Sequence, residues 1–242
     1  MKKNRPMCLL LGAFAALAMV STAMAHPGGL NTPSPDLPPI IVPGVYLSPS
    51  DVHAKYSGPA LEVVLSMVEH QPFAELDPDD FLCRDPGGAD CDEHHHFGSN
   101  LHAMVSINNG PLQPIEMQGP VMTVAYGKGP GDTTGTFDTE MLSMSLSGGP
   151  AMIRESPSKA STGKTSIIPL GPGGTGPYHI DSFFDVFTEL SLDGGTSWMP
   201  SNMGSDGQSH PTRVYLGGIP EPASFVLLAI GLLGCAGFAR RR

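Results

Sequence analysis

Hydrophobic residues at alternating positions form the main pattern in the central part of the chain. Leu142, Met144 and Leu146 share one face of the segment 137–146, whose other face carries mostly Ser and Thr. The longer segment 178–192 alternates in the same way. Shorter hydrophobic runs lie at 61–70, 101–107, 121–126 and 213–216. A period of two residues is typical of β-strands with one buried face.

Turn-forming dipeptides separate these predicted strands. Asn109-Gly110, Gly148-Gly149 and Asp193-Gly194 combine residues that readily adopt the left-handed conformation of tight hairpins. No segment between residues 26 and 222 sustains a helical period. Many short strands joined by Gly- and Pro-rich loops predict an all-β chain with an antiparallel β-sandwich-like domain.

The N-terminus has the pattern of a secretory signal peptide. Lys2, Lys3 and Arg5 precede an apolar run at 7–20, and Ala23-Met24-Ala25 offers a cleavage site with small residues. Fourteen apolar residues span about 21 Å as a helix, less than the roughly 30 Å of a bilayer core. We therefore expect a signal helix at 1–25 that signal peptidase removes after export.

The C-terminus carries a second processing pattern. Pro220, Glu221 and Pro222 precede an apolar stretch at 224–239. The chain ends with Arg240, Arg241 and Arg242. The stretch predicts a transmembrane helix in the precursor, inserted transiently with its basic tip in the cytoplasm.

Motif, helix and basic tip together resemble a PEP-CTERM sorting signal, which exosortases of Gram-negative bacteria recognise. The resemblance covers 219–242 and implies cleavage near Pro220–Pro222 by exosortase. It implies an inner-membrane intermediate, followed by transfer to the cell surface or to an extracellular polysaccharide matrix. The discarded tail then acts as an address, as in a GPI signal.

These ends define four predicted regions: a signal peptide at 1–25, a Pro-rich spacer at 26–59, a β-rich domain at 60–218 and the sorting signal at 219–242. The segments 152–166 and 178–201 are also similar to stretches of exported PEP-CTERM proteins of uncharacterised function. That second resemblance implies no catalytic residues.

The net charge of the segment between the two processed ends limits the classes of molecule that the protein can bind. The 26–222 segment holds all 23 acidic residues and only seven Lys and Arg, so its net charge is −16 with His neutral. Nucleic-acid binding needs a basic surface and is therefore excluded. An acidic surface favours cationic partners or divalent ions.

Cys83 and Cys91 are the two cysteines of the chain that survive removal of both ends. An oxidising compartment favours a disulfide between them, closing a local loop.

The adjoining segment 90–96 is dense in metal ligands. His94 and His96 would share one face of a strand, which suits Zn²⁺ or Cu²⁺, while nearby carboxylates could bind Ca²⁺. The competing interpretation is a solvated acidic loop that binds no metal, so no cofactor is assigned.

The segment Ser191–Trp198 is similar to an Asp-box, S-x-D-x-G-x-T-W, with Ser197 where Thr is usual. Asp-boxes recur in sialidase propellers, but one copy and about 160 residues are too few for such a propeller. We interpret this segment as a structural hairpin.

No G-x-S-x-G nucleophile elbow occurs in the chain. The sequence therefore predicts a non-enzymatic structural or adhesive protein, with extracellular polysaccharide as a candidate partner. The alternative is a metal-binding extracellular module or metal-dependent hydrolase that uses the His94–His96 segment.

Overall fold

The computed structural model describes residues 29–40, 44–48, 53–84, 91–201 and 208–218. The described elements are β1 (Leu30–Thr32), β2 (Gly44–Leu47), β3 (Ala54–Gly58), β4 (Leu61–Cys83), β5 (Cys91–Ile107), β6 (Gln113–Ala125), β7 (Gly135–Gly148), β8 (Ala151–Glu155), β9 (Ser161–Pro169), the 3-10 turn η1 (Pro172–Gly174), β10 (Tyr178–Val186), β11 (Thr188–Ser191), β12 (Met199–Pro200) and β13 (Thr212–Gly218). The predicted all-β, antiparallel class is confirmed over these residues.

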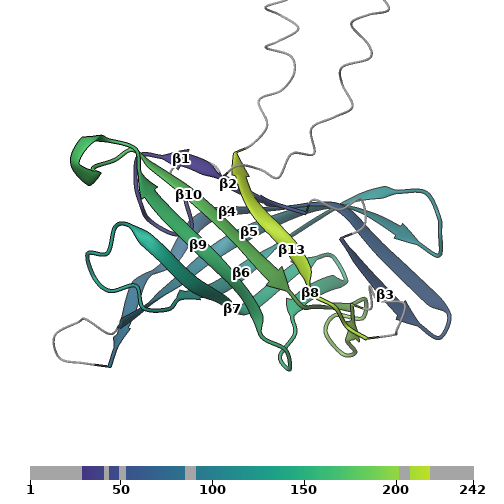
Figure 1. The fold of residues 1–242 in the computed structure, drawn as a ribbon. Helices are drawn as coiled ribbons and strands as arrows, with labels where there is room; N and C mark the ends of the chain where they lie inside the picture. Colours follow the sequence, from purple (N-terminus) through teal and green to yellow (C-terminus); the bar gives the residue numbers. More distant parts are fainter. Residues whose placement is uncertain (1–28, 41–43, 49–52, 85–90, 202–207, 219–242) are drawn as a thin grey trace, which may run out of the picture.

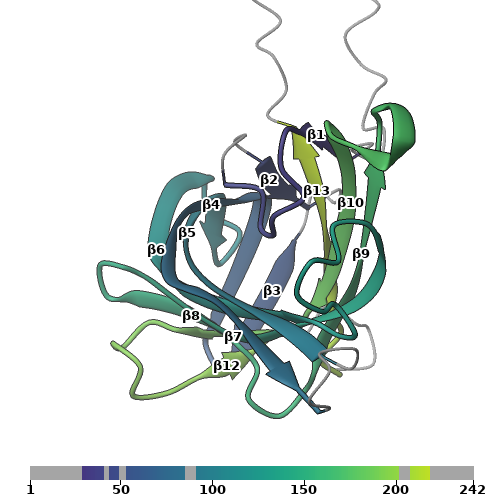
Figure 2. The same cartoon turned by 90° about the vertical axis from the view of Figure 1, so that its left-hand side faces the viewer.

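The strands form one continuous sheet that closes on itself. Neighbouring strands follow the order β10–β13–β2–β4–β5–β6–β7, and β9 pairs with both β7 and β10 to complete the circle. Figure 2 shows the sheet curling around a central space. The two layers expected of a sandwich are thus joined along both edges, which leaves no free edge within this circuit.

The long strands β4, β5, β6 and β7 form one side of this wall (Figure 1). The other side consists of two groups of paired strands. The first group contains β9, β10, β13 and β2, and the second contains β8, β11 and β12. An antiparallel bridge between Tyr56 of β3 and Ser201, just after β12, connects β3 to the second group. β10 and β11 lie in the predicted segment 178–192, which is interrupted at Phe187.

Residues on the inner face of the sheet form the core, but many of them are polar. The largest fully buried side chains include Tyr56, Leu101, Ile153, Ile180 and Leu216. Buried Ser and Thr side chains face the same interior and pair with one another. Ser182 Oγ accepts a hydrogen bond from Tyr46 Oη at 3.2 Å and lies 2.8 Å from Thr165 Oγ1. Hydrogen bonding offsets the cost of burying these hydroxyls.

Two details of the predicted strands need correction. Leu142 is exposed, whereas Met144 and Leu146 are buried as predicted. The pairing of β6 with β7 shifts between Met122 and Thr123, so that β7 holds one extra residue there and its alternation reverses. The first hairpin turn uses Asn108 and Asn109, both with positive φ, one residue before the predicted pair.

Part of the segment predicted as a Pro-rich spacer is folded into the sheet. It contains β1, β2 and β3, and its Leu37 is buried. Leu37 and Pro38 line the central cavity. These strands were not predicted, because they are short and lack a clear alternation of hydrophobic and polar residues.

The predicted signal peptide and the predicted C-terminal transmembrane helix both lie outside the described residues. Among the residues that the structure describes, no helix is long and apolar enough to cross a membrane.

Candidate functional site

The long hairpin of β4 and β5 carries most of the predicted site residues. Cys83 and Cys91 face each other across the two strands and form a disulfide, with their Cα atoms 3.9 Å apart. This is the predicted pair, and the bond closes the 84–90 loop. A loop of this length should stabilise the fold by roughly 2–3 kcal/mol, mainly by restricting the unfolded chain.

Alternation along β5 separates the three consecutive histidines. His94 and His96 lie on the outer face of the strand and are partly exposed, whereas His95 lies on the inner face and is 2% exposed. His96 Nδ1 donates to Asp77 Oδ2 at 2.7 Å. The predicted metal candidates His94 and His96 do share a face, as expected. The only group of three or more metal-ligating residues among those described contains neither of them.

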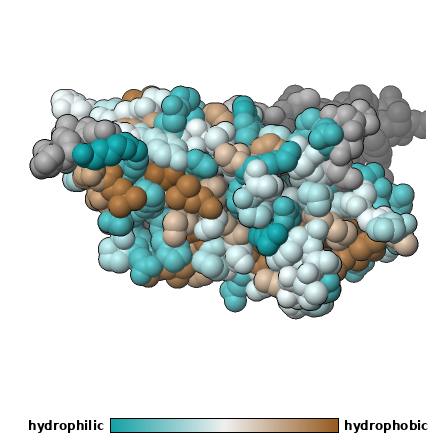
Figure 3. Space-filling model, turned by 90° about the horizontal axis from the view of Figure 1, so that it is seen from below, coloured by the Kyte–Doolittle hydropathy of each residue, from teal (hydrophilic) through white to brown (hydrophobic). Residues whose placement is uncertain are grey.

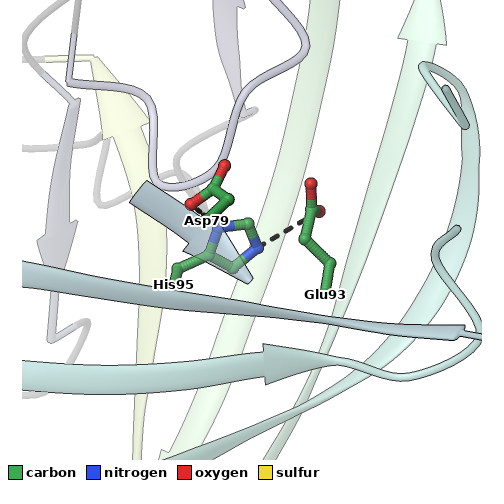
Figure 4. A group of neighbouring side chains, drawn as sticks. All are labelled: Asp79, Glu93 and His95. Carbon is green, nitrogen blue, oxygen red and sulfur yellow. Dashed lines mark hydrogen bonds and ion pairs between the residues drawn. The ribbon is translucent and has the colours of Figure 1, made fainter. Parts of the chain in front are cut away.

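That group consists of Asp79, Glu93 and His95 (Figure 4). Asp79 and Glu93 lie on opposite sides of the imidazole ring. His95 Nδ1 donates to Asp79 Oδ1 at 2.9 Å, and His95 Nε2 lies 3.2 Å from Glu93 Oε2. Lys128, only 6% exposed, also contacts Glu93 Oε2 through its ammonium group. Four charged or chargeable groups thus share one buried site.

The backbone of β4 explains why Asp79 reaches this site. Asp77 pairs with His96 and Asp80 pairs with His94, so β4 has one residue more than β5 between these two pairs. Such a bulge redirects the side chain of the extra residue. Asp79, within the bulge, consequently meets the inner-face His95.

Opposing effects set the pKa values in the cluster. Burial tends to lower the pKa of His95, but its close contacts with the Asp79 and Glu93 carboxylates and their negative charges outweigh burial and raise that pKa. Burial tends to raise the pKa of Glu93, but His95 and Lys128 outweigh it and lower that pKa. A low-dielectric setting makes both carboxylates strongly dependent on their cationic partners.

His95 also lines a cavity of about 40 Å³ inside the closed sheet, which exceeds the volume one water molecule requires. Two further histidines, His53 and His70, line the same cavity. Burial lowers the pKa of His53 to about 3 and that of His70 to about 4, so both rings are neutral near pH 7. His53 Nδ1 and Thr139 Oγ1 are buried and have no hydrogen-bond partner.

His94 and His96 were the predicted candidate metal ligands, whereas the cluster on the inner face was not predicted. Glu93 and His95 are two residues apart, so they lie on the same face of a strand, opposite to His94 and His96. This spacing was the feature of the sequence that could have indicated the inner-face pair. Asp79 and Lys128 gave no comparable signal, because their positions depend on the bulge in β4 and on the loop after β6.

The Asp-box segment forms the predicted structural hairpin. The Asp193 carboxylate accepts hydrogen bonds from the Ser197 backbone N–H at 2.9 Å and from Ser191 Oγ at 2.8 Å. The Ser197 hydroxyl donates to the same carboxylate at 2.6 Å, and this bond, followed by the other two, lowers the pKa of Asp193 to about 2. The Trp198 indole N–H donates to the Gly195 carbonyl at 3.0 Å, and the Arg154 guanidinium covers its ring.

Comparison with known proteins identifies one feature of the chain. Residues 218–242 match the PEP-CTERM protein-sorting motif. The predicted sorting signal is thereby confirmed, and it marks an exported protein that exosortase recognises and that is sorted to the surface. Its residues from 219 onward lie outside the described part of the chain. Neither a search of curated proteins nor a search of solved structures found a match.

Proposed function

We propose that this PEP-CTERM protein serves at the cell surface, or in an extracellular polysaccharide matrix, as a non-enzymatic structural or adhesive domain. The main support is the position of the sorting motif relative to the fold. The motif begins at residue 218, and β13, the last strand among the described residues, ends at Gly218. The described fold therefore ends where the sorting signal starts.

β13 is an inner strand of the closed sheet. It pairs with β10 on one side and with β2 on the other, through residues such as Tyr215, which faces Phe183 and Leu47. Cleavage near Pro220–Pro222 would leave both ladders intact. Processing would thus remove the membrane-directed tail without unpairing a strand, which is what delivery of a folded cargo requires.

The beginning and the end of the described domain also lie together. Gly29 forms a parallel bridge with Gly217, and β1 pairs with β10 beside β13. Both processing sites would therefore be near one end of the domain. The rest of the surface would be available for contact with the matrix.

Surface composition supports a hydrated extracellular role. Figure 3 shows hydrophobic residues on one face as separate patches among hydrophilic ones. The processed segment has a net charge of −16, which favours contact with cationic groups and with divalent ions. Polysaccharide is the proposed matrix partner.

Fractionation of the native host tests the sorting part of this proposal. We expect an extracellular species that starts near His26 and ends near Pro222 by intact mass. Glu221→Ala should leave precursor in the membrane fraction, whereas Glu116→Ala, on β6 with a side chain 80% exposed, should be released normally. A wild-type protein that keeps Arg240–Arg242 at steady state would contradict release.

Incubation of the released protein with the host's extracellular polysaccharide tests the second part. We expect sedimentation with the polysaccharide and no release of new reducing ends. Hydrolysis that disappears on substitution of a single carboxylate would show an enzyme instead.

A second candidate function, a metal-binding extracellular module or a metal-dependent hydrolase, concerns the His94–His96 segment. The observation in its favour is the placement of His95 between the carboxylates of Asp79 and Glu93.

A further inference from the structure

We infer that His95, Glu93 and Asp79 form a Zn²⁺ site on the inner face of the β4–β5 hairpin. His95 Nε2 and the Glu93 carboxylate bind the ion, and Asp79 positions the imidazole ring. Ligand atoms of the three residues all lie within 4.8 Å of one another. The inference concerns the second candidate function and holds whatever the destination of the protein.

The contact between His95 Nε2 and Glu93 Oε2 carries the argument. The two atoms are 3.2 Å apart and both are buried; His95 Nε2 has no well-aligned hydrogen-bond partner, whereas Glu93 Oε2 is also in contact with the Lys128 ammonium group. A proton shared in a good hydrogen bond lies close to the line between its two atoms. A tetrahedral metal ion lies off that line, and ligand atoms about 2.0–2.2 Å from Zn²⁺ are then roughly 3.3–3.5 Å apart. The observed separation of 3.2 Å is slightly below that range, so binding of an ion by both atoms requires only a small movement of the two side chains.

The other ring nitrogen of His95 already has the partner that a metal-binding histidine needs. An ionised carboxylate can only accept, so Nδ1–H donates to Asp79 Oδ1 and leaves Nε2 available as the ligand. Histidines that bind metal usually donate their second N–H to a carboxylate or carbonyl in this way. Asp79 therefore acts as a positioning residue.

The charges of the neighbouring groups favour a cation at this position. Ionised Asp79 and Glu93 with the Lys128 ammonium sum to −1 in a site that is largely removed from water. A further cation beside Nε2, a proton or a metal ion, is required to offset this charge. A proton on His95 brings the sum to zero. Zn²⁺ in place of that proton brings it to +1, which a hydroxide ligand on the ion would return to zero, while Lys128 keeps its contact with Glu93.

The surroundings leave space for the remaining coordination positions. His95 faces the central cavity, which is large enough for more than one water molecule and is also lined by Thr139, whose buried Oγ1 has no partner. The Asp79 side chain is 25% exposed, so an ion can reach the site from solvent. Imidazole nitrogen and carboxylate oxygen are both donors that Zn²⁺ accepts, and water would fill the remaining coordination positions.

Isothermal titration with ZnCl₂ of the chelator-treated, purified protein tests the site. We expect one Zn²⁺ per chain, loss of this binding in His95→Gln, and affinity lower by about 10- to 100-fold in Asp79→Asn. Asp79→Asn keeps the shape of the side chain, so it remains informative even if His95→Gln fails to fold. Circular dichroism of each variant reports folding independently of metal binding.

His96→Gln is the matched control. His96 also pairs with an aspartate, Asp77, and lies next to His95, but on the outer face of the strand. We expect its Zn²⁺ affinity to equal that of the wild type. Absence of Zn²⁺ binding by the wild type would overturn the inference, and so would equal losses in His95→Gln and His96→Gln. Neither result would affect the sorting proposal, which fractionation tests separately.

Discussion

The imidazole rings of His53 and His70 lie 6.5 Å apart, centroid to centroid, at the wall of one cavity. His53 directly precedes β3, and His70 lies in β4. Burial favours the neutral form of both rings, and proximity of the two adds to this effect for His53. The pair therefore makes the fold sensitive to acid.

The stability of the fold should decrease as pH falls below 6.5. The folded pKa values, about 3 and about 4, lie below the ordinary value of 6.5, so protons bind preferentially to the unfolded chain between these limits. Each histidine should remove roughly 1.4 kcal/mol of unfolding free energy per pH unit while only the unfolded form is protonated. Urea unfolding at pH 7, 6, 5 and 4 measures this slope.

His53→Gln should reduce the acid slope by about one proton. His102→Gln is the matched control, because the His102 side chain is 45% exposed on the outer face of β5. It should leave the slope unchanged. An unaltered slope in His53→Gln would show that another group causes the acid sensitivity.

Glu155 should give the opposite pH dependence. Burial and the charges of Glu140 and Glu189 raise its pKa to about 7, although the hydrogen bond from Ser161 tends to lower it. The folded state then holds the Glu155 proton more tightly than the unfolded state, whose pKa is near 4.5. The stabilising contribution of this group is complete below pH 4.5 and is lost as pH rises through about 7.

Glu155→Gln should therefore be more stable than the wild type at pH 8, with the advantage vanishing near pH 4.5. Thermal unfolding across this range measures the difference. Glu189→Gln is a useful comparison, because Glu189 accepts two hydrogen bonds from Arg154 and one from Ser156. That variant should be destabilised at pH 8. Equal behaviour of the two variants would refute the assignment to Glu155.

The disulfide should stabilise the long hairpin. The double variant Cys83→Ser/Cys91→Ser should lose roughly 2–3 kcal/mol of unfolding free energy, since the unfolded chain regains the freedom of the closed loop. Urea unfolding under non-reducing conditions measures the loss. A reducing agent should destabilise the wild type by a similar amount and leave the double variant unchanged. If it destabilised both equally, the effect would not come from this bond.

The sequence was sufficient for the strand class but not for the site. The alternation predicted for 178–192 is present in β10, whose Ile180, Phe184 and Val186 are buried, because this strand pairs without interruption. It failed for Leu142, and it could not place Asp79, because one extra residue in a strand reverses its alternation. A residue in a bulge can be recognised only from how its strand pairs with the neighbouring strand, and the sequence of the strand alone does not show this pairing.

Closure of the sheet was equally inaccessible from local patterns. It depends on β9 pairing with both β7 and β10, and β9 begins in a segment rich in Ser, Thr and Gly. β9 has little hydrophobic alternation, so its position in the fold follows from its pairing with strands that are distant in the sequence.

Gly119 should be essential to the close approach of β6 and β7. A Cβ atom at this position would lie 2.0 Å from the Ser145 carbonyl oxygen, a backbone atom that cannot turn away as a side chain could. Gly119→Ala should therefore destabilise the protein by about 1–3 kcal/mol or more, since the two strands must separate locally. Gly58→Ala, in β3, is the matched control: its nearest neighbour would be Met199 Sδ at 3.4 Å, an ordinary contact with a flexible side chain. Urea unfolding should show Gly58→Ala within about 0.5 kcal/mol of the wild type. Equal stability of the two variants would mean that β6 and β7 do not approach as closely at Gly119 as described.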